Sequence, residues 1–417
     1  MVQCKFGVVI MTTTNVYAVG STLWKPLKND RFRTLWVANV FSNLGTWMQG
    51  MGATWLMVQI SSSSQMVALV QTAMTLPIFL LVIPAGIIAD KYDRPTFLLL
   101  THAAMGLAAL GLSILVTFDI ATPEMLLFGT FLIGCGAAMT MPAWQAAMST
   151  LVEPRELHSA AALNGMSFNF ARAVGPAIAG FIAQATALSM IFWINAISYL
   201  GLIIVFRRWS KTSTRLSRRE CAEDIPSSTA SFRYLSKDVR FRALLLRTFV
   251  CFFAASSMWS LLPAFAGIQL HMQASEVGLL LGAIGFGAVL GGVFVPTLKD
   301  SIGINRLTLF APLLLSFALI LVAWKGETYW IWISMLLTGL GWAFVVSGLN
   351  GSAQGMLPKE LRARAISVYL MVMYGATSAG SALWGAVSIY WGLSAAFLVS
   401  GAMLTIAIGI LLRWPIE

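Results

Sequence analysis

Residues 86–95 read GIIADKYDRP and place four charged side chains within ten residues. The chain of 417 residues has only 10% charged residues, 58% hydrophobic residues and a mean hydropathy of +0.80. Apolar runs lie on both sides of this stretch and recur along the chain. Each run has about 20 residues, which is enough for a helix to cross a hydrocarbon core of roughly 30 Å. We therefore predict that residues 86–95 hold a short loop between two membrane spans.

The apolar runs predict twelve transmembrane helices in an all-α, polytopic membrane protein. The expected spans are residues 34–58, 66–89, 96–118, 124–149, 158–184, 189–207, 240–264, 275–298, 304–324, 328–351, 361–388 and 392–412. Both ends of the chain then lie on one side of the membrane. If that side is the cytoplasm, all 27 Lys and Arg except Arg172 and Lys325 fall in cytoplasmic segments or helix ends. The net charge of +11 therefore indicates membrane orientation and no nucleic-acid partner.

The chain contains an internal repeat. PLKNDRFRTLW at residues 26–36 matches LSKDVRFRALL at residues 235–245, and LVEPRELHSAAAL from residue 151 matches MLPKELRARAISV from residue 356. The offsets are about half the chain, which indicates two duplicated six-helix bundles. We predict a cytoplasmic tail at 1–33, bundles at 34–207 and 240–413, and between them a polar cytoplasmic linker at 208–239.

Several kinds of site have no support in the sequence. The four cysteines have no pairing or metal-ligand spacing, so we expect neither a disulfide framework nor a metal site; they are Cys4, Cys135, Cys221 and Cys251. There is no G-x-x-x-x-G-K-[ST] phosphate loop, so we expect no cofactor and no direct ATP drive. The N-terminal thirty residues hold only a short apolar stretch and no small-residue cleavage site, so we expect no cleaved signal peptide. The three histidines are scattered, which argues against the rival hypothesis of a polytopic membrane enzyme.

The loop at residues 86–95 resembles the signature of the major facilitator superfamily, G-x-x-x-D-[RK]-x-G-[RK]-[RK]. Gly86, Asp90, Lys91 and Arg94 fit this pattern, whereas Asp93 replaces its second Gly and a proline its last basic residue. In the second half, VPTLKDSIGINR at residues 295–306 keeps the Asp and the second Gly. The segments at 27–49 and 169–180 are similar to the branch that contains the bacterial enterobactin exporter and related efflux permeases. The resemblance implies two six-helix bundles and transport by alternating access.

The resemblance also implies a conformational switch in this loop. Asp90 is expected to meet the positively charged start of the eleventh helix, and Asp300 to make the pseudo-symmetric contact with the fifth. The expected switch residues are Gly86, Asp90, Lys91, Arg94, Asp300, Arg362 and Arg364. The alternative is a loop that is charged only to stay in solvent.

One charge, that of Arg172, lies deep within a predicted span. An intramembrane charge is costly, so it is a functional candidate. Arg172 either faces the cavity and attracts an anionic or carbonyl-rich substrate, or ties helices together through backbone carbonyls. Gly175 and Pro176 on the same span are similar to the fifth-helix motif of efflux transporters and are predicted to form a hinge.

The superfamily lines its cavity mainly with the first, fourth, seventh and tenth helices. Together with the fifth span, these suggest a substrate cavity made by Asn39, Asn43, Trp47, Met139, Asn169, Arg172, Trp259, Trp342 and Asn350. Aromatic and Met side chains suit a bulky, partly apolar ligand. Relatives often have an acid near position 54, where this chain has Thr54. A proton gradient is a candidate energy source, but no deep carboxylate identifies the proton carrier.

Taken together, these features predict a secondary transporter in the bacterial inner membrane, monomeric, with both ends in the cytoplasm. The leading hypothesis is export of a small amphipathic molecule, a siderophore or a drug-like compound. An importer of similar solutes is the alternative within transporters.

Overall fold

The structure is a computed structural model that describes residues 23–212, 237–324, 329–356, 359–412 and 414. Twelve long helices account for most of these residues, and the described part contains no strand. The first six are α2 (Asp30–Ile60), α3 (Ser64–Lys91), α4 (Arg94–Thr117), α5 (Pro123–Leu151), α6 (Leu157–Ala185) and α7 (Ser189–Thr212). The second six are α9 (Val239–Ala264), α10 (Ala274–Ile302), α11 (Ile304–Ala323), α12 (Tyr329–Gly355), α13 (Lys359–Trp391) and α14 (Leu393–Leu411). The predicted twelve-helix membrane fold is confirmed.

Three short helices stand between or before the long ones: η1 (Lys25–Lys28), η2 (Pro154–Glu156) and η3, a π-helical turn at Phe265–Gln269. Among the described residues, nine of the long helices are apolar and long enough to cross a membrane by length and composition alone. Helix α14 has a shorter apolar run, Leu393–Gly409. Helices α2 and α6 are more polar because they carry the asparagines and the arginine that face one another or the interior.

The helices begin and end where capping groups allow, so several extend past the predicted hydrophobic spans. Asn29 caps α2 by accepting hydrogen bonds from the backbone N–H of Arg31 at 3.0 Å and Phe32 at 3.4 Å. Helix α2 therefore starts four residues before the predicted span. Similarly, α7 continues to Thr212, so the first residues of the predicted linker are helical.

The sequence repeat reproduces the same local structure in both halves. Asp238 caps α9 by accepting from the backbone N–H of Arg240 and Phe241, as Asn29 does for α2. The phenylalanine of each copy, Phe32 or Phe241, is at most 1% exposed. The repeated residues therefore fix the start and the rotation of the first helix of each half.

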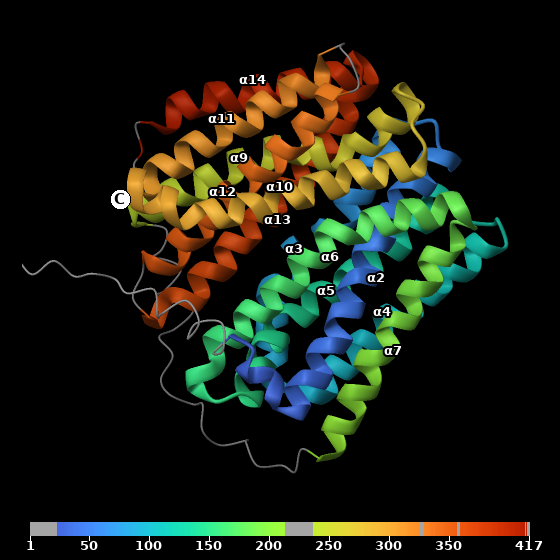
Figure 1. The fold of residues 1–417 in the computed structure, drawn as a ribbon, viewed down its shortest axis with the longest axis vertical. Coiled ribbons are helices and arrows are strands. Elements are labelled where there is room, and N and C mark those ends of the chain that lie inside the picture. The colour runs from blue at the N-terminus through green and yellow to red at the C-terminus, as the bar shows by residue number, and fades with distance from the viewer. Residues whose placement is uncertain (1–22, 213–236, 325–328, 357–358, 413, 415–417) are drawn as a thin grey trace, which may run out of the picture.

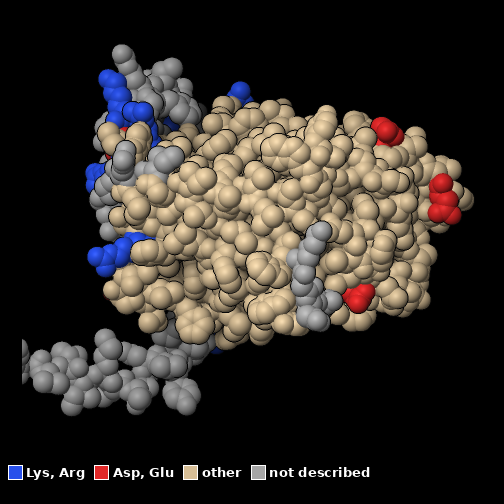
Figure 2. Space-filling model, turned by 90° about the horizontal axis from the view of Figure 1, so that it is seen from above, with Lys and Arg blue, Asp and Glu red and all other residues tan. Residues whose placement is uncertain are grey.

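Figure 1 shows the two halves as separate groups of helices, α2–α7 from blue to green and α9–α14 from yellow to red. They meet mainly along two helix pairs, α3 with α13 and α6 with α10. On the face shown in Figure 2, Lys and Arg gather at one end of the bundle and Asp and Glu at the other. We call these the basic end, where α3 ends and α4 begins, and the acidic end, where α4 ends and α5 begins.

The halves are joined at the acidic end. There the hydroxyls of Ser64 and Ser388 lie 2.7 Å apart and Gln184 donates to the side chain of Gln273. A buried apolar cluster that includes Met48, Met51, Leu261 and Phe265 also spans both halves. Toward the basic end α6 and α10 separate, because a Cβ added to Gly165 on α6 or Gly292 on α10 would have no atom within 4 Å. On the other side of the interface, Ile83 of α3 and Leu370 of α13 still share an apolar cluster.

The corner at the basic end is built differently in the two halves. In the second half, Gly303 has a φ of +81° between α10 and α11, a conformation that favours glycine. In the first half Asp93 has a φ of −60° and caps α4, accepting from the backbone N–H of Thr96 at 3.2 Å and its hydroxyl at 2.7 Å. The replacement of the signature Gly by Asp93 thus follows from a turn that needs no left-handed residue.

Candidate functional site

A cavity of about 440 Å³ lies between the two halves. Its described lining comes from α2, α3, α5, α6 and α7 on one side and from α9, α12 and α13 on the other. The residues include Trp47, Gln49, Gln71, Thr75, Thr130, Phe168, Arg172, Asn195, Phe252, Trp259, Trp342, Asn350, Tyr369, Met373 and Tyr374. The size is that of a site for a small organic molecule.

Aromatic side chains form a wall on each side of the cavity. In the first half, the Trp47 ring meets Phe168 edge-on, with centroids 5.6 Å apart. In the second half, Trp342 meets Trp259 at 5.4 Å and Phe252 at 5.0 Å, both in T-shaped geometry. Such rings offer flat apolar surface to a partly apolar ligand.

Arg172 is the one charged residue among the described residues that line the cavity. It makes no hydrogen bond or ion pair within the described chain, and its Nε atom is buried without a partner. Of the two interpretations from sequence, the geometry favours the cavity-facing one, because no backbone carbonyl receives this guanidinium. A positive charge without a counter-ion attracts an anionic ligand.

Five of the predicted cavity residues lie in the lining: Trp47, Arg172, Trp259, Trp342 and Asn350. Asn350 accepts a hydrogen bond from Gln354 Nε2 at 3.2 Å.

Two predicted residues instead join helices α2 and α6. The side chain of Asn39 donates to Asn164 Oδ1 at 3.0 Å, and that of Asn43 donates to Ser167 Oγ at 3.0 Å. With the bond from Trp36 Nε1 to the carbonyl of Leu163, at 3.0 Å, they form a ladder of three rungs.

The remaining two predicted residues also lie outside the cavity lining. Met139 packs against a cluster that includes Leu35, Phe97 and Phe206, within the first half. Asn169 is exposed and donates to the carbonyl of Gly165 at 2.9 Å.

The predicted hinge residues, Gly175 and Pro176, are buried in continuous helix α6. A Cβ added at Gly175 would lie 2.9 Å from Cβ of Trp47, so this glycine lets α2 approach α6 beside the cavity. Bending at this point stays a prediction.

Helices α6 and α10 touch through glycines between the cavity and the acidic end. A Cβ at Gly180 would lie 2.5 Å from the carbonyl oxygen of Ala274, and a Cβ at Gly278 would overlap the carbonyl oxygen of Pro176. We call these contacts the glycine seam. Because backbone meets backbone here, the seam closes the acidic end tightly.

The predicted switch residues lie at the basic end, where the halves diverge. Arg94 donates to the carbonyl of Ala146 at 3.4 Å, while Lys91, Asp300 and Arg362 are exposed. The backbone at Gly86 is open, with no atom within 4 Å of an added Cβ. Arg364 is partly exposed and has an interaction partner. The side chain of Asp90 and residues 357–358, just before α13, lie outside the described part, so the latch stays a prediction.

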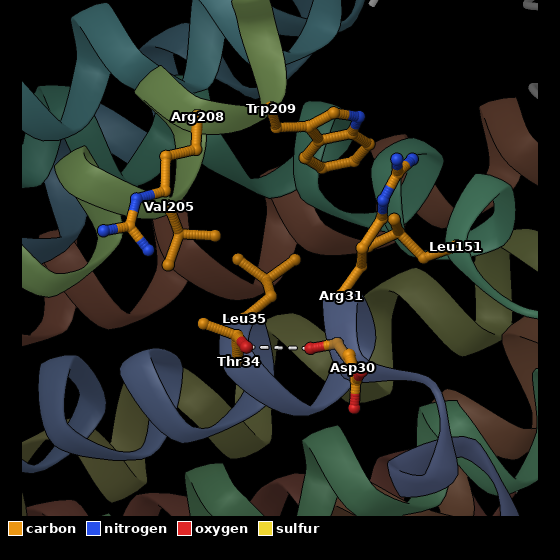
Figure 3. Close-up of a pocket in the computed structure, with 8 residues that line it drawn as sticks. All are labelled: Asp30, Arg31, Thr34, Leu35, Leu151, Val205, Arg208 and Trp209. Atoms are coloured by element: carbon orange, nitrogen blue, oxygen red, sulfur yellow. Dashed lines mark hydrogen bonds between the residues drawn. The ribbon is translucent and has the colours of Figure 1, made fainter. Parts of the chain in front are cut away.

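A second pocket, of about 240 Å³, lies at the basic end of the first half (Figure 3). Its lining comes from α2, α5 and α7 alone: Asp30, Arg31, Thr34, Leu35, Leu151, Val205, Arg208 and Trp209. Thr34 Oγ1 donates to the carbonyl of Asp30 at 2.8 Å. Among the described residues, none of the second half lines this pocket, so it lacks the interface position that alternating access requires. Nearby, the hydrogen bond and charge of Glu156 raise the pKa of Lys25, with Nζ and Oε1 3.0 Å apart.

Sequence reasoning missed a second buried arginine. Arg247 on α9 is 0% exposed and donates to Thr308 Oγ1 at 2.8 Å and to the carbonyl of Trp414 at 2.9 Å. Sequence analysis singled out Arg172 by its depth within a span and did not anticipate that Arg247 is buried as well. Arg247 has the helix-tying role that was the alternative for Arg172. Its position near the start of a span made it look like a helix-end charge.

Tyr369 and Asn195 were also missed. They lie on α13 and α7, two helices that were not among those expected to line the cavity. The Asn195 side chain donates to Oε1 of Gln49 on α2, a helix that was expected to line it. Among the described residues, no group of three or more His, Cys, Asp or Glu is placed to hold a metal ion.

The family model described as transmembrane secretion effector matches residues 21–417. The chain belongs to this family, within the major facilitator superfamily. It is 22% identical to the staphyloferrin A transporter of Staphylococcus aureus over 361 residues, covering 86% of this chain and 89% of that protein. It is 25% identical to the enterobactin exporter EntS of Shigella flexneri over 388 residues, covering 91% of this chain and 90% of that protein.

Solved structures of transporters share the fold. A bacterial homologue of the lysosomal transporter Spinster, in an inward-facing and occupied conformation, has a TM-score of 0.73 at 14% identity and covers 93% of this chain and 97% of its own. A bacterial homologue of ferroportin in an inward-facing state has a TM-score of 0.67 at 15% identity, covering 92% and 98%. The protein is thus a membrane transporter of the major facilitator type; its relatives and its fold are those of transporters, not enzymes.

Proposed function

We propose that the protein is a secondary active exporter that carries a small amphipathic compound, a siderophore or a drug-like molecule, out of the bacterial cytoplasm. The observation that carries this proposal is the cavity between the two halves, which is closed on one side by the glycine seam. The names of the two relatives, a staphyloferrin A transporter and an enterobactin exporter, support a siderophore.

The charge distribution supports an orientation for this cavity. Positively charged residues favour the cytoplasmic side, so the basic end is assigned to the cytoplasm and the acidic end to the outside. The halves diverge at the basic end, so the cavity opens inward, in the state that loads substrate from the cytoplasm. On this assignment the chain sits in the inner membrane as a monomer with both ends in the cytoplasm.

Transport in inside-out membrane vesicles tests the proposal. Vesicles that contain the protein are expected to accumulate enterobactin, staphyloferrin A or an amphipathic dye faster than vesicles without it. Right-side-out vesicles, in which an importer accumulates substrate from outside, are the control for direction. Accumulation only in right-side-out vesicles, or in neither kind, contradicts export.

The same vesicles test the energy source. We propose a proton gradient, although no carboxylate is among the described residues that line the cavity. Collapse of the gradient with an ionophore is expected to stop accumulation. Unchanged accumulation contradicts proton coupling.

A further inference from the structure

The cavity lining holds buried donors without partners. In the described part of the chain, eight buried side-chain polar atoms make no hydrogen bond, and four belong to residues of the lining: Thr130 Oγ1, Arg172 Nε, Trp259 Nε1 and Tyr369 OH. A buried polar group without a partner costs free energy, and most are paired in folded proteins. Four around one cavity therefore point to a partner that is not part of the chain.

These four groups can all donate. The guanidinium Nε and the indole Nε1 are donors only, and the two hydroxyls can donate or accept. Two amide oxygens of the lining already accept a hydrogen bond, Gln49 Oε1 from Asn195 and Asn350 Oδ1 from Gln354. With no Asp or Glu among the described lining residues, Arg172 leaves the cavity with a positive charge.

The donors come from both halves. Arg172 lies on α6 and Thr130 on α5, while Trp259 lies on α9 and Tyr369 on α13. The aromatic walls adjoin them, with Phe168 four residues before Arg172 on α6 and the ring of Trp342 packed on Trp259.

Resting on the proposed function, we propose that these donors form a clamp for the anionic, oxygen-rich group of an amphipathic substrate. A carboxylate, catecholate or hydroxamate supplies the acceptor oxygens, which Arg172 binds from the first half and Trp259 and Tyr369 from the second. The apolar part of the substrate lies against the aromatic walls.

The clamp also explains how substrate drives occlusion. The Nε of Arg172, the Nε1 of Trp259 and the hydroxyl of Tyr369 are all covered in this state, so they reach an oxygen only after the side chains turn or the halves approach. A ligand that gains contacts in the closed arrangement shifts the equilibrium toward it. An oxygen bound at once by both halves has this effect.

Binding of two matched probes tests the clamp. 1-Naphthoate and its neutral amide, 1-naphthamide, share the aromatic body and differ in the anionic group. Calorimetry on the purified full-length protein in nanodiscs is expected to show naphthoate binding about tenfold more tightly than naphthamide. Arg172→Gln is expected to abolish this preference, and Arg172→Lys to keep only part of it, since Lys lacks the planar fork.

Removal of the second-half donors separates binding from folding. Trp259→Phe and Tyr369→Phe keep an aromatic ring and delete the donor, so each is expected to weaken naphthoate binding about tenfold. The thermal stability of ligand-free Tyr369→Phe should hold or rise, because this change removes only an unpaired buried hydroxyl. Ser381→Ala is the matched control, since it deletes an unpaired buried hydroxyl from the same helix as Tyr369 but outside the cavity lining. It is expected to leave naphthoate binding unchanged.

Equal binding of the two probes, no measurable binding of naphthoate, or a preference that survives Arg172→Gln overturns the clamp. So does a loss of naphthoate binding in Ser381→Ala as large as that in Tyr369→Phe. The vesicle assay keeps this result apart from the proposed function. Export without anion preference refutes the clamp alone, whereas anion preference without export refutes the exporter.

Discussion

The glycine seam gives a quantitative prediction about the equilibrium between states. A Cβ at Gly180 would lie 2.5 Å from the carbonyl oxygen of Ala274 and 3.0 Å from Cα of Ser275, both backbone atoms that cannot turn away. Gly180→Ala should therefore push α6 and α10 apart at the acidic end. Overpacking of this kind costs about 1–3 kcal/mol. The cost falls only on the state in which the seam is closed.

The matched control is Gly165→Ala on the same helix. An added Cβ there has no atom within 4 Å, so this change alters helix propensity as Gly180→Ala does but does not touch the seam. A cost of about 1–3 kcal/mol corresponds to a shift of about 5- to 150-fold in the ratio of the two states. The shift should favour the state that is open at the acidic end.

Spin-label distances measure this shift. Labels at two exposed positions of the acidic end, Thr186 in the first half and His271 in the second, report the separation of the halves. In a cysteine-free background, Gly180→Ala is expected to add a longer distance component that Gly165→Ala lacks. If both variants give the wild-type distribution, the seam does not control closure and the reasoning fails.

Three further predictions concern topology, stability and the switch. In spheroplasts of a cysteine-free variant, Cys introduced at Asp119 should react with an impermeant maleimide and Cys at Lys299 should not; the reverse result contradicts the orientation. Arg247→Met should lower the free energy of unfolding by about 1–3 kcal/mol, because buried Thr308 Oγ1 loses its donor, and the melting temperature should fall. Exposed Arg242→Met should change the free energy of unfolding by less than about 0.5 kcal/mol. Asp90→Asn should reduce the outward-open population about 2- to 30-fold, because a helix-terminus contact contributes about 0.3–2 kcal/mol. If distances between spin labels across the basic end do not change, the loop is charged only to stay in solvent.

The sequence was sufficient for the fold because its signals are local or repeated. Apolar length predicts each span, and the two capping motifs recur at Asn29 and Asp238 with the same result. The predicted helix ends were less accurate. An apolar run marks only the part of a helix within the membrane, whereas α2 and α7 continue beyond their apolar runs.

The site was only partly predictable. Arg172 was found because a deep charge is rare, and the tryptophans because they are large. The rotation of a helix about its axis depends on tertiary packing, so Met139 and Asn43 were expected to face a cavity that they do not line. The burial of Arg247 could not be predicted for the same reason, because its hydrogen-bond partners, on α11 and beyond α14, are distant in sequence.

The three hydrogen bonds between α2 and α6 bear on how substrate loading on one side of the membrane differs from release on the other. Three hydrogen bonds hold these helices together, so Trp47 and Arg172 keep their relative positions whenever the first half moves as a rigid body. Trp47 and Arg172 then offer the substrate the same rigid surface in the inward-open and in the outward-open state. If the proposed clamp is right, the difference between loading and release arises on the second-half side of the cavity, from Trp259 and Tyr369. Substitutions of Trp47 or Arg172 should therefore alter which compound is transported. Substitutions of Trp259 or Tyr369 should alter on which side of the membrane the compound is released.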